Sequence, residues 1–147
     1  MTVLDAFAVL ALLKDEPAAG QVEQLLRSDL SCTLTALGVA EVLDHLVRQM
    51  GVDEDEAVLD LAQLGLGTPV PVDGDLGARG GLLRARRYHR QHCSISLADC
   101  VAAEAARASG APVATSDPHL LDMCALETIP HLPLPDARGN LWTRHWS

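Results

Sequence analysis

Residues 2–13 read TVLDAFAVLALL, and this stretch decides the fold expected for the chain. Its first three residues are a short apolar run typical of a buried strand, and Asp5 separates them from the segment AFAVLALL, which it could cap as a helix. Acidic residues also mark three later apolar segments, GVAEVL, SLADC and VATSD. The four acids are Asp5, Glu41, Asp99 and Asp117.

Short Val- and Leu-rich runs alternate along the chain with longer segments of helical period. This alternation predicts an α/β domain with a small, mainly parallel sheet flanked by helices. Strands are expected at residues 2–4, 31–34, 69–72, 113–115 and 127–129. Helices are expected at residues 36–50, 53–64, 75–92 and 96–109.

Each acid has a structural explanation when it is taken alone. Asp5 could cap the first helix, and Asp117 precedes Pro118, a common way to begin a helix. Asp99 could form a capping box with Ser96 and would suit the helix dipole. Glu41 lies opposite the apolar stripe of its helix, so periodicity alone predicts a surface residue.

Taken together, the four acids indicate a shared site. Asp5 and Asp117 follow strands, and the carboxyl ends of parallel strands meet at one edge of a sheet, where ligands collect. Several carboxylates in one pocket are costly unless a cation neutralises them. A set of ligands with oxygen donors alone selects a hard cation, so the pattern predicts Mg²⁺ or Mn²⁺.

Length and composition set the domain organisation. A chain of 147 residues with 48% hydrophobic content predicts one domain with its own core, placed at residues 1–134, followed by a Pro-rich C-terminal tail at 135–147. The apolar start is interrupted by Asp5 and falls short of the ~20 residues that span a membrane. A cytoplasmic protein without a membrane segment is therefore expected. The four cysteines lack C-x-x-C spacing and are expected to be small buried hydrophobes.

The net charge of −9 argues against general attraction to nucleic acid, but the basic residues are unevenly spread. Residues 77–92, GARGGLLRARRYHRQH, hold five of the eleven Lys and Arg residues. The segment could be a solvated helix face or a phosphate-binding surface beside the acids. In the second interpretation, Arg84, Arg87 and Arg90 bind RNA phosphates.

Four fragments carry a family resemblance: VLDAFAVLALL, VAEVL, SLADCVAAEAA and GAPVATSDPHLL. In this order they resemble the PIN-domain family, in particular the VapC-type toxins of bacterial toxin–antitoxin pairs, and the resemblance spans the chain from Thr2 to about Leu134. The resemblance implies a PIN-like fold and a Mg²⁺- or Mn²⁺-dependent endoribonuclease. Its metal-binding acids would be Asp5, Glu41, Asp99 and Asp117. Thr115 matches the family pattern as a supporting residue, whereas Phe7 stands where the family commonly has a small hydroxyl residue.

The resemblance also implies an RNA substrate, a cognate VapB-type antitoxin and a homodimer. Hydrolysis by a metal-activated water predicts products with a 5′-phosphate and a 3′-hydroxyl. The alternative is a non-catalytic PIN-fold module that uses its acidic groove to bind a partner. Metal titration separates the two, because intact ligands should bind Mn²⁺. Trp142 and Trp146 could anchor a partner or pack on the domain, and His119 and His131 are expected to be incidental.

Overall fold

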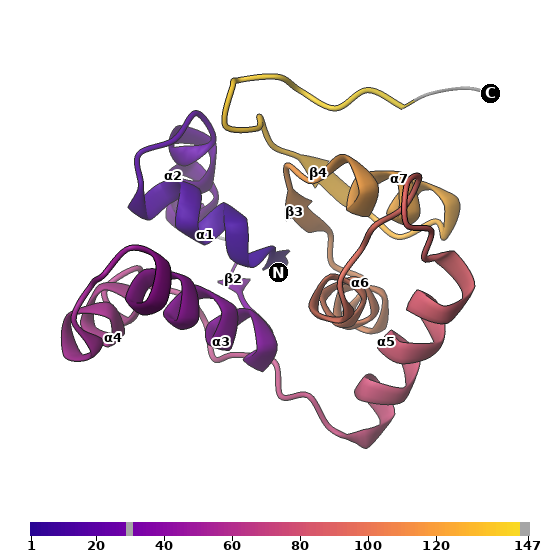
Figure 1. The fold of residues 1–147 in the computed structure, drawn as a ribbon, viewed down its shortest axis with the longest axis horizontal. Coiled ribbons are helices and arrows are strands. Elements are labelled where there is room, and N and C mark those ends of the chain that lie inside the picture. Colours follow the sequence, from indigo (N-terminus) through magenta and orange to yellow (C-terminus); the bar gives the residue numbers. More distant parts are fainter. Residues whose placement is uncertain (29–30, 145–147) are drawn as a thin grey trace.

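A parallel sheet runs through the middle of the computed structural model, which describes residues 1–28 and 31–144 (Figure 1). In this part of the chain the strand order is β2-β1-β3-β4, and every neighbouring pair is parallel. The prediction of an α/β fold with a mainly parallel sheet is therefore confirmed. The strands are β1 (Thr2–Leu4), β2 (Cys32–Thr33), β3 (Val113–Thr115) and β4 (His131–Pro133).

Helices cover both faces of this sheet (Figure 1). Successive residues of a strand point to opposite faces. Leu4 accordingly packs with α1, α2 and α3 on one face, whereas Val3 packs with α5, α6 and α7 on the other. The helical elements are α1 (Ala6–Leu13), α2 (Ala19–Arg27), α3 (Ala36–Asp44), the π-helical turn η1 (His45–Gln49), α4 (Glu54–Ala62), α5 (Gly74–Arg87), α6 (Leu97–Ser109) and α7 (Pro118–Leu126).

The helix termini follow the signals in the sequence. Thr35 caps α3 by accepting a hydrogen bond from the Gly38 amide, at 3.1 Å. Ser96 and Asp99 form the expected capping box of α6, and Gly110 ends that helix with a φ of 66°, a conformation that glycine adopts without a steric penalty. These local signals predicted both helices because they depend on residues close in sequence.

Glycine within α5 serves packing against α6. A Cβ atom built at Gly80 would lie 2.7 Å from a methyl carbon of Val101. The two helices can therefore approach closely only because this position has no side chain. The glycines of this segment made its start hard to predict from sequence, although α5 begins at Gly74, next to the expected position.

Two predicted strands are wrong. In residues 69–72, Val70 forms an isolated bridge to Thr35, and no regular strand follows. Residues 127–129 form the turn after α7, where the Ile129 amide donates to the Cys124 carbonyl, and the strand begins at His131 instead. The predicted helix at 75–92 is also too long. It ends at Arg87, because His89 and Cys93 exchange two backbone hydrogen bonds in a turn.

The C-terminal segment returns to the domain. Indole Nε1 of Trp142 donates to Asp122 on α7 at 2.8 Å, and its ring meets that of His131 edge-on at 5.5 Å. Trp142 therefore packs back on the fold, while Trp146 lies outside the described residues. The proposed boundary near residue 134 stays a prediction.

His119 has a structural contact, since its Nδ1 accepts the Ser94 amide at 2.7 Å. Three of the cysteines are buried as expected and Cys93 is half-buried. None of the helices in the described ranges is long and apolar enough to cross a membrane.

Candidate functional site

Asp5 and Asp117 lie where two adjacent strands end and their connections diverge. Asp5 follows β1, whose chain continues through α1 and α2 to β2 on one side, and Asp117 follows β3, whose chain continues through α7 to β4 on the other. Helices α1 and α7 pack on opposite faces of the sheet. In parallel sheets, such a switch point leaves a crevice at the carboxyl ends of the strands, and ligands bind there.

Thr115 connects these two acids. Its hydroxyl donates to Asp5 Oδ2 at 2.7 Å, and its Oγ1 accepts the backbone N–H of Asp117 at 3.0 Å. Asp5 also accepts the Phe7 amide, and Asp117 accepts the His119 amide, so each carboxylate caps the helix that follows it. The Thr115 contact is the informative one, because a helix cap requires no side chain from a strand 110 residues away.

Asp99 and Glu41 come from two other helices. Asp99 Oδ2 accepts the Ser96 amide at 3.0 Å in the first turn of α6, and the side chain is half-buried. Glu41 is in the second half of α3 and is also half-buried, so the surface position that periodicity predicts holds only in part. Contacts between α3 and α6 bring the helices of these two acids together.

The charge of Asp99 interacts with each of the other three acids. Burial, followed by the charge of Asp99, raises the pKa of Asp5 to about 7. Burial and then Asp99 also raise the pKa of Glu41. The pKa of Asp99 itself is raised by burial and by Asp117, against the hydrogen bonds from Ser96. Among the described residues, no Lys or Arg contributes to these three shifts.

The donor set fits a hard divalent cation. All of the donors are carboxylate oxygens, and their mutual repulsion disfavours the charged forms until positive charge arrives. Within residues 1–28 and 31–144, however, no three His, Cys, Asp or Glu side chains stand close enough to ligate one ion together. The described acids therefore interact electrostatically but do not form a complete coordination sphere.

The PIN domain model matches residues 2–126, which is most of the chain. The chain belongs to the PIN domain family. The fold predicted by the resemblance is thus confirmed. A comparison with curated protein sequences found no match.

Solved structures with the same fold include a toxin and a toxin–antitoxin complex. FitAcB from Neisseria gonorrhoeae is 23% identical with a TM-score of 0.63, over 90% of this chain and 96% of that one. VapC20 from Mycobacterium tuberculosis, described as a sarcin–ricin loop cleaving toxin, is 18% identical with a TM-score of 0.60, over 77% and 87%. A chain of a toxin–antitoxin complex from Klebsiella pneumoniae is 14% identical with a TM-score of 0.60, over 80% of this chain and 87% of that one.

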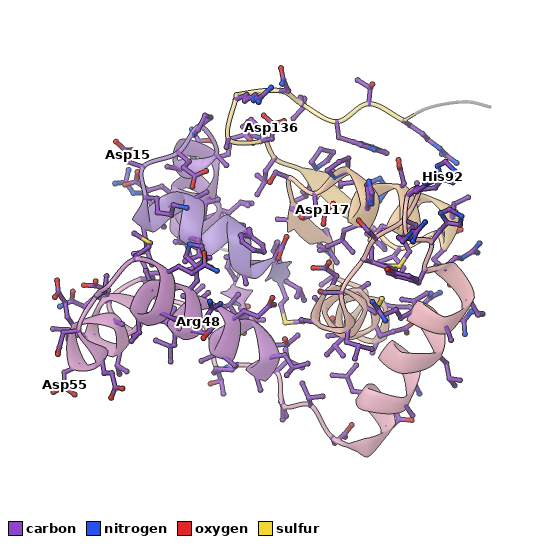
Figure 2. The ribbon with its side chains drawn as sticks, viewed as in Figure 1. Asp15, Arg48, Asp55, His92, Asp117 and Asp136 are labelled. Carbon is purple, nitrogen blue, oxygen red and sulfur yellow. The ribbon has the colours of Figure 1, made fainter. Side chains whose placement is uncertain are left out.

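A cavity of about 200 Å³ adjoins two acids of this PIN domain, and sequence reasoning missed most of its wall. Asp5 and Asp117 line it together with Glu16, Asp136 and Phe7. Figure 2 labels Asp117 at the end of β3 and Asp136 on the segment that passes beside it. Glu16 lies between α1 and α2, and Asp136 lies in the segment that follows β4. No local sequence pattern specifies the path of either segment past the acids.

The three arginines proposed for RNA binding differ in their surroundings. Arg84 donates to the Ile95 carbonyl at 2.9 Å, and its guanidinium lies 4.3 Å from the centroid of the Tyr88 ring. Arg87 pairs with Glu127 at 2.6 Å, whereas Arg90 is exposed. The first two therefore have structural roles in this PIN domain, and their contact with RNA stays a prediction.

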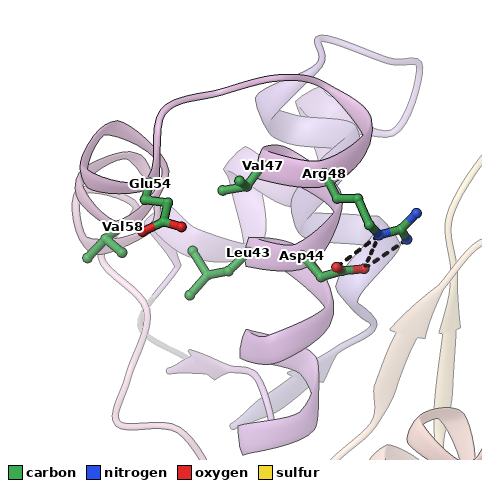
Figure 3. A pocket seen from close by; sticks show the side chains of 6 residues that line it. All are labelled: Leu43, Asp44, Val47, Arg48, Glu54 and Val58. Carbon is green, nitrogen blue, oxygen red and sulfur yellow. Dashed lines mark hydrogen bonds and ion pairs between the residues drawn. The ribbon is translucent and has the colours of Figure 1, made fainter.

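A second cavity of about 360 Å³ lies away from the acids, between α3, η1 and α4 (Figure 3). Leu43, Val47 and Val58 supply its apolar wall, and Asp44 and Arg48 form an ion pair of 2.9 Å at its rim. None of the four acids lines this cavity. Its groups carry no pattern that indicates chemistry.

Proposed function

We propose that this PIN domain is a divalent-metal-dependent endoribonuclease and the toxin of a type II toxin–antitoxin pair. One observation carries the proposal: buried Asp5, oriented by Thr115, faces other carboxylates at the switch point of the sheet. Carboxylates with raised pKa values in a crevice are typical of functional sites. Structural similarity to VapC20, described as a sarcin–ricin loop cleaving toxin, and to a toxin–antitoxin complex supports the choice of reaction.

Within this proposal, Asp5, Glu41, Asp99 and Asp117 hold Mg²⁺ or Mn²⁺. Thr115 orients Asp5 through its hydroxyl and fixes the start of α7 through the Asp117 amide. When bound, the ion would supply positive charge to the scissile phosphate and lower the pKa of the attacking water. Cleavage leaves a 5′-phosphate and a 3′-hydroxyl, so a cyclic phosphate in end-group analysis would contradict this mechanism.

The test mixes purified protein and an end-labelled pool of small RNAs with Mg²⁺, Mn²⁺ or chelator, beside an Asp99→Asn variant. Discrete cleavage that requires metal and is lost in the variant supports the proposal and identifies a substrate. Cleavage that survives chelator or the substitution would indicate a contaminating nuclease, and a complete absence of cleavage would count against the proposed activity.

The same comparison supports a proposal about an antitoxin partner. A toxin–antitoxin complex and VapBC2 from Rickettsia felis, bound to a DNA fragment from their promoter, share this fold. We therefore propose a VapB-type antitoxin, a homodimer of this chain and a cytoplasmic location. Co-expression with a candidate VapB-type antitoxin, followed by copurification and sedimentation, tests the first two. A monomer that copurifies with nothing would contradict them.

The arginines provide a graded test of RNA contact. Arg90→Ala should weaken RNA binding and reduce its salt dependence without loss of stability, because Arg90 is exposed. Arg84→Ala and Arg87→Ala should reduce both binding and stability, since each side chain also has an internal partner. An unchanged salt slope in all three variants would assign the segment to structure alone.

A non-catalytic PIN module is the second candidate function. The observation that favours it is the spacing of the acids, since no three potential ligands within the described ranges are gathered around one point. In this case the acidic groove binds a basic partner. Calorimetric titration with Mn²⁺ separates the two functions: saturable binding that Asp5→Asn removes supports the nuclease, and no binding supports the module.

A further inference from the structure

Phe7, the single phenylalanine of the chain, lies at the surface beside the acids. It is in the first turn of α1, two residues after Asp5, and 55% of its surface is exposed. Its neighbours Ala6, Ala8 and Val9 are all buried. Exposed apolar side chains are common at protein surfaces, so the position of this ring beside the acids, and not its exposure, is the informative feature.

The Phe7 ring has an aromatic neighbour from another acid-bearing helix. Its centroid lies 6.1 Å from that of His45, with the two planes at 81°. His45 is the first residue of η1, four residues after Glu41, which places the two on the same side of the helix. The pair therefore bridges the helices that carry Asp5 and Glu41. Aromatic residues make up only 3% of the chain, which makes this pairing informative.

The cavity that adjoins the acids includes Phe7 in its wall. Asp5, Asp117 and Phe7 all line the same space of about 200 Å³. A group that enters this cavity meets carboxylates and an aromatic surface together. A nucleotide is such a group, because its phosphate needs the cation that carboxylates hold and its base has an aromatic face.

We propose that Phe7, flanked by His45, stacks on an unpaired nucleobase next to the scissile phosphate. This inference rests on the proposed ribonuclease function and adds a base-positioning subsite to it. Unstacked bases of single-stranded RNA bind aromatic side chains in this way without a requirement for sequence. Stacking also suits a protein with a net charge of −9, because it contributes affinity that does not depend on attraction of phosphates.

Direct binding tests this inference without catalysis. The protein carries Asp99→Asn, and fluorescence polarisation measures its Kd for a labelled single-stranded RNA of mixed sequence. The same measurement uses an oligonucleotide of equal length made of abasic spacer residues. In this background Phe7→Ala should weaken RNA binding about 5- to 150-fold and leave the affinity for the abasic chain unchanged.

Three further variants separate stacking from other roles. Phe7→Tyr should bind RNA like the parent because it keeps the ring, whereas Phe7→Leu should lose affinity like Phe7→Ala. Leu59→Ala is the matched control, since Leu59 is also 55% exposed but lies on α4. It should bind RNA like the parent.

Several results would overturn the base-stacking role. These are full affinity in Phe7→Ala or Phe7→Leu, an equal loss for RNA and for the abasic chain, or a defect confined to antitoxin binding. If one of these results is obtained and the wild-type protein still cleaves RNA, the base-stacking role fails but the proposed ribonuclease function stands. If the wild type cleaves no RNA with either metal, the proposed function fails, and the subsite fails with it.

Discussion

Two shielded carboxylates, Asp5 before α1 and Glu127 after α7, differ in what surrounds them. Asp5 is 5% exposed and lies beside Asp117, at the carboxyl edge of the sheet, where other carboxylates face it. Glu127, with a side chain 10% exposed, follows α7 and meets Arg86, Arg87 and Arg107 at 3.6, 2.6 and 2.6 Å. The same chain thus surrounds one acid with cations and another with acids.

The consequence appears in their proton affinities. Burial alone would raise the pKa of Glu127, but hydrogen bonds from Arg87 and Arg107 outweigh it and the pKa is lowered. Burial and Asp99 raise the pKa of Asp5 to about 7. The contrast teaches that arginines can neutralise a shielded acid in this fold. Among the described residues, no Lys or Arg contributes to the pKa shift of Asp5, which supports the proposed cation site.

Loss of the acids facing Asp5 should give the largest effect. Asp5→Asn and Asp117→Asn should each lower metal-dependent RNA cleavage by about 100-fold or more, because the ion contributes several kcal/mol to catalysis. Glu127→Gln is the control from the opposite end of α7 and should keep the specific activity of the folded protein. Initial cleavage rates with Mn²⁺ measure all three. Comparable losses of cleavage in all three variants would contradict the proposal that Asp5 and Asp117 act in catalysis and Glu127 does not.

Thr115 allows the region of Asp5 to be tested separately from that of Glu127, because its hydroxyl contacts Asp5 and the Asp117 amide. Thr115→Val removes the hydroxyl that donates to Asp5 and accepts from the Asp117 amide, so cleavage should fall about 10- to 100-fold. Thr115→Ser keeps the hydroxyl and should retain most of the activity. Cleavage rates and Mn²⁺ titrations of both variants provide the measurement. Equal activity in Val and Ser variants would show that this hydrogen bond has no role in the reaction.

The arginine-bound region should respond in stability instead. Glu127→Ala leaves three guanidinium groups without their shared carboxylate, and we expect a loss of about 1–3 kcal/mol in the free energy of unfolding, since the arginines are partly exposed. Urea denaturation of the variant and the wild type measures the loss. An unchanged midpoint would mean that the cluster contributes nothing net to stability.

The two acids should also respond in opposite directions to pH. The folded-state pKa of Asp5, about 7, exceeds its ordinary value of 3.8, so the folded protein binds the additional proton between these values. Without metal, the contribution of Asp5 to stability should therefore fall as the pH rises from about 4 to about 7. Glu127 has a lowered pKa, so its contribution is present above 4.5 and is lost as the pH falls through its folded-state value.

Urea midpoints measured with chelator across this pH range check the difference. Asp5→Asn should flatten the fall between about pH 4 and pH 7. Glu127→Gln should preserve this fall and reduce the loss of stability at lower pH. A wild type whose stability rises steadily from about pH 4 to pH 7 would contradict the account of Asp5.

Local signals predicted most of the secondary structure and two strand ends of the candidate site. Capping at Thr35 and Ser96, and the strand–acid order around Asp5 and Asp117, are properties of neighbouring residues. The strand expected at residues 127–129 was wrong. The Ile129 amide donates a hydrogen bond to the Cys124 carbonyl, so this residue belongs to the turn that ends α7. Periodicity likewise identified Glu41 as a surface residue, although packing against neighbouring elements half-buries it.

By itself, the sequence determined the α/β class, several helix starts and the strand–acid pairs at Asp5 and Asp117, because these follow from hydrophobic period and capping chemistry over a few residues. Tertiary structure alone decided which charges meet. It placed Thr115 against Asp5 across 110 residues, gave Glu127 its arginines and left Phe7 exposed at the acidic cavity. Such contacts depend on the packing of distant segments, which no local pattern contains.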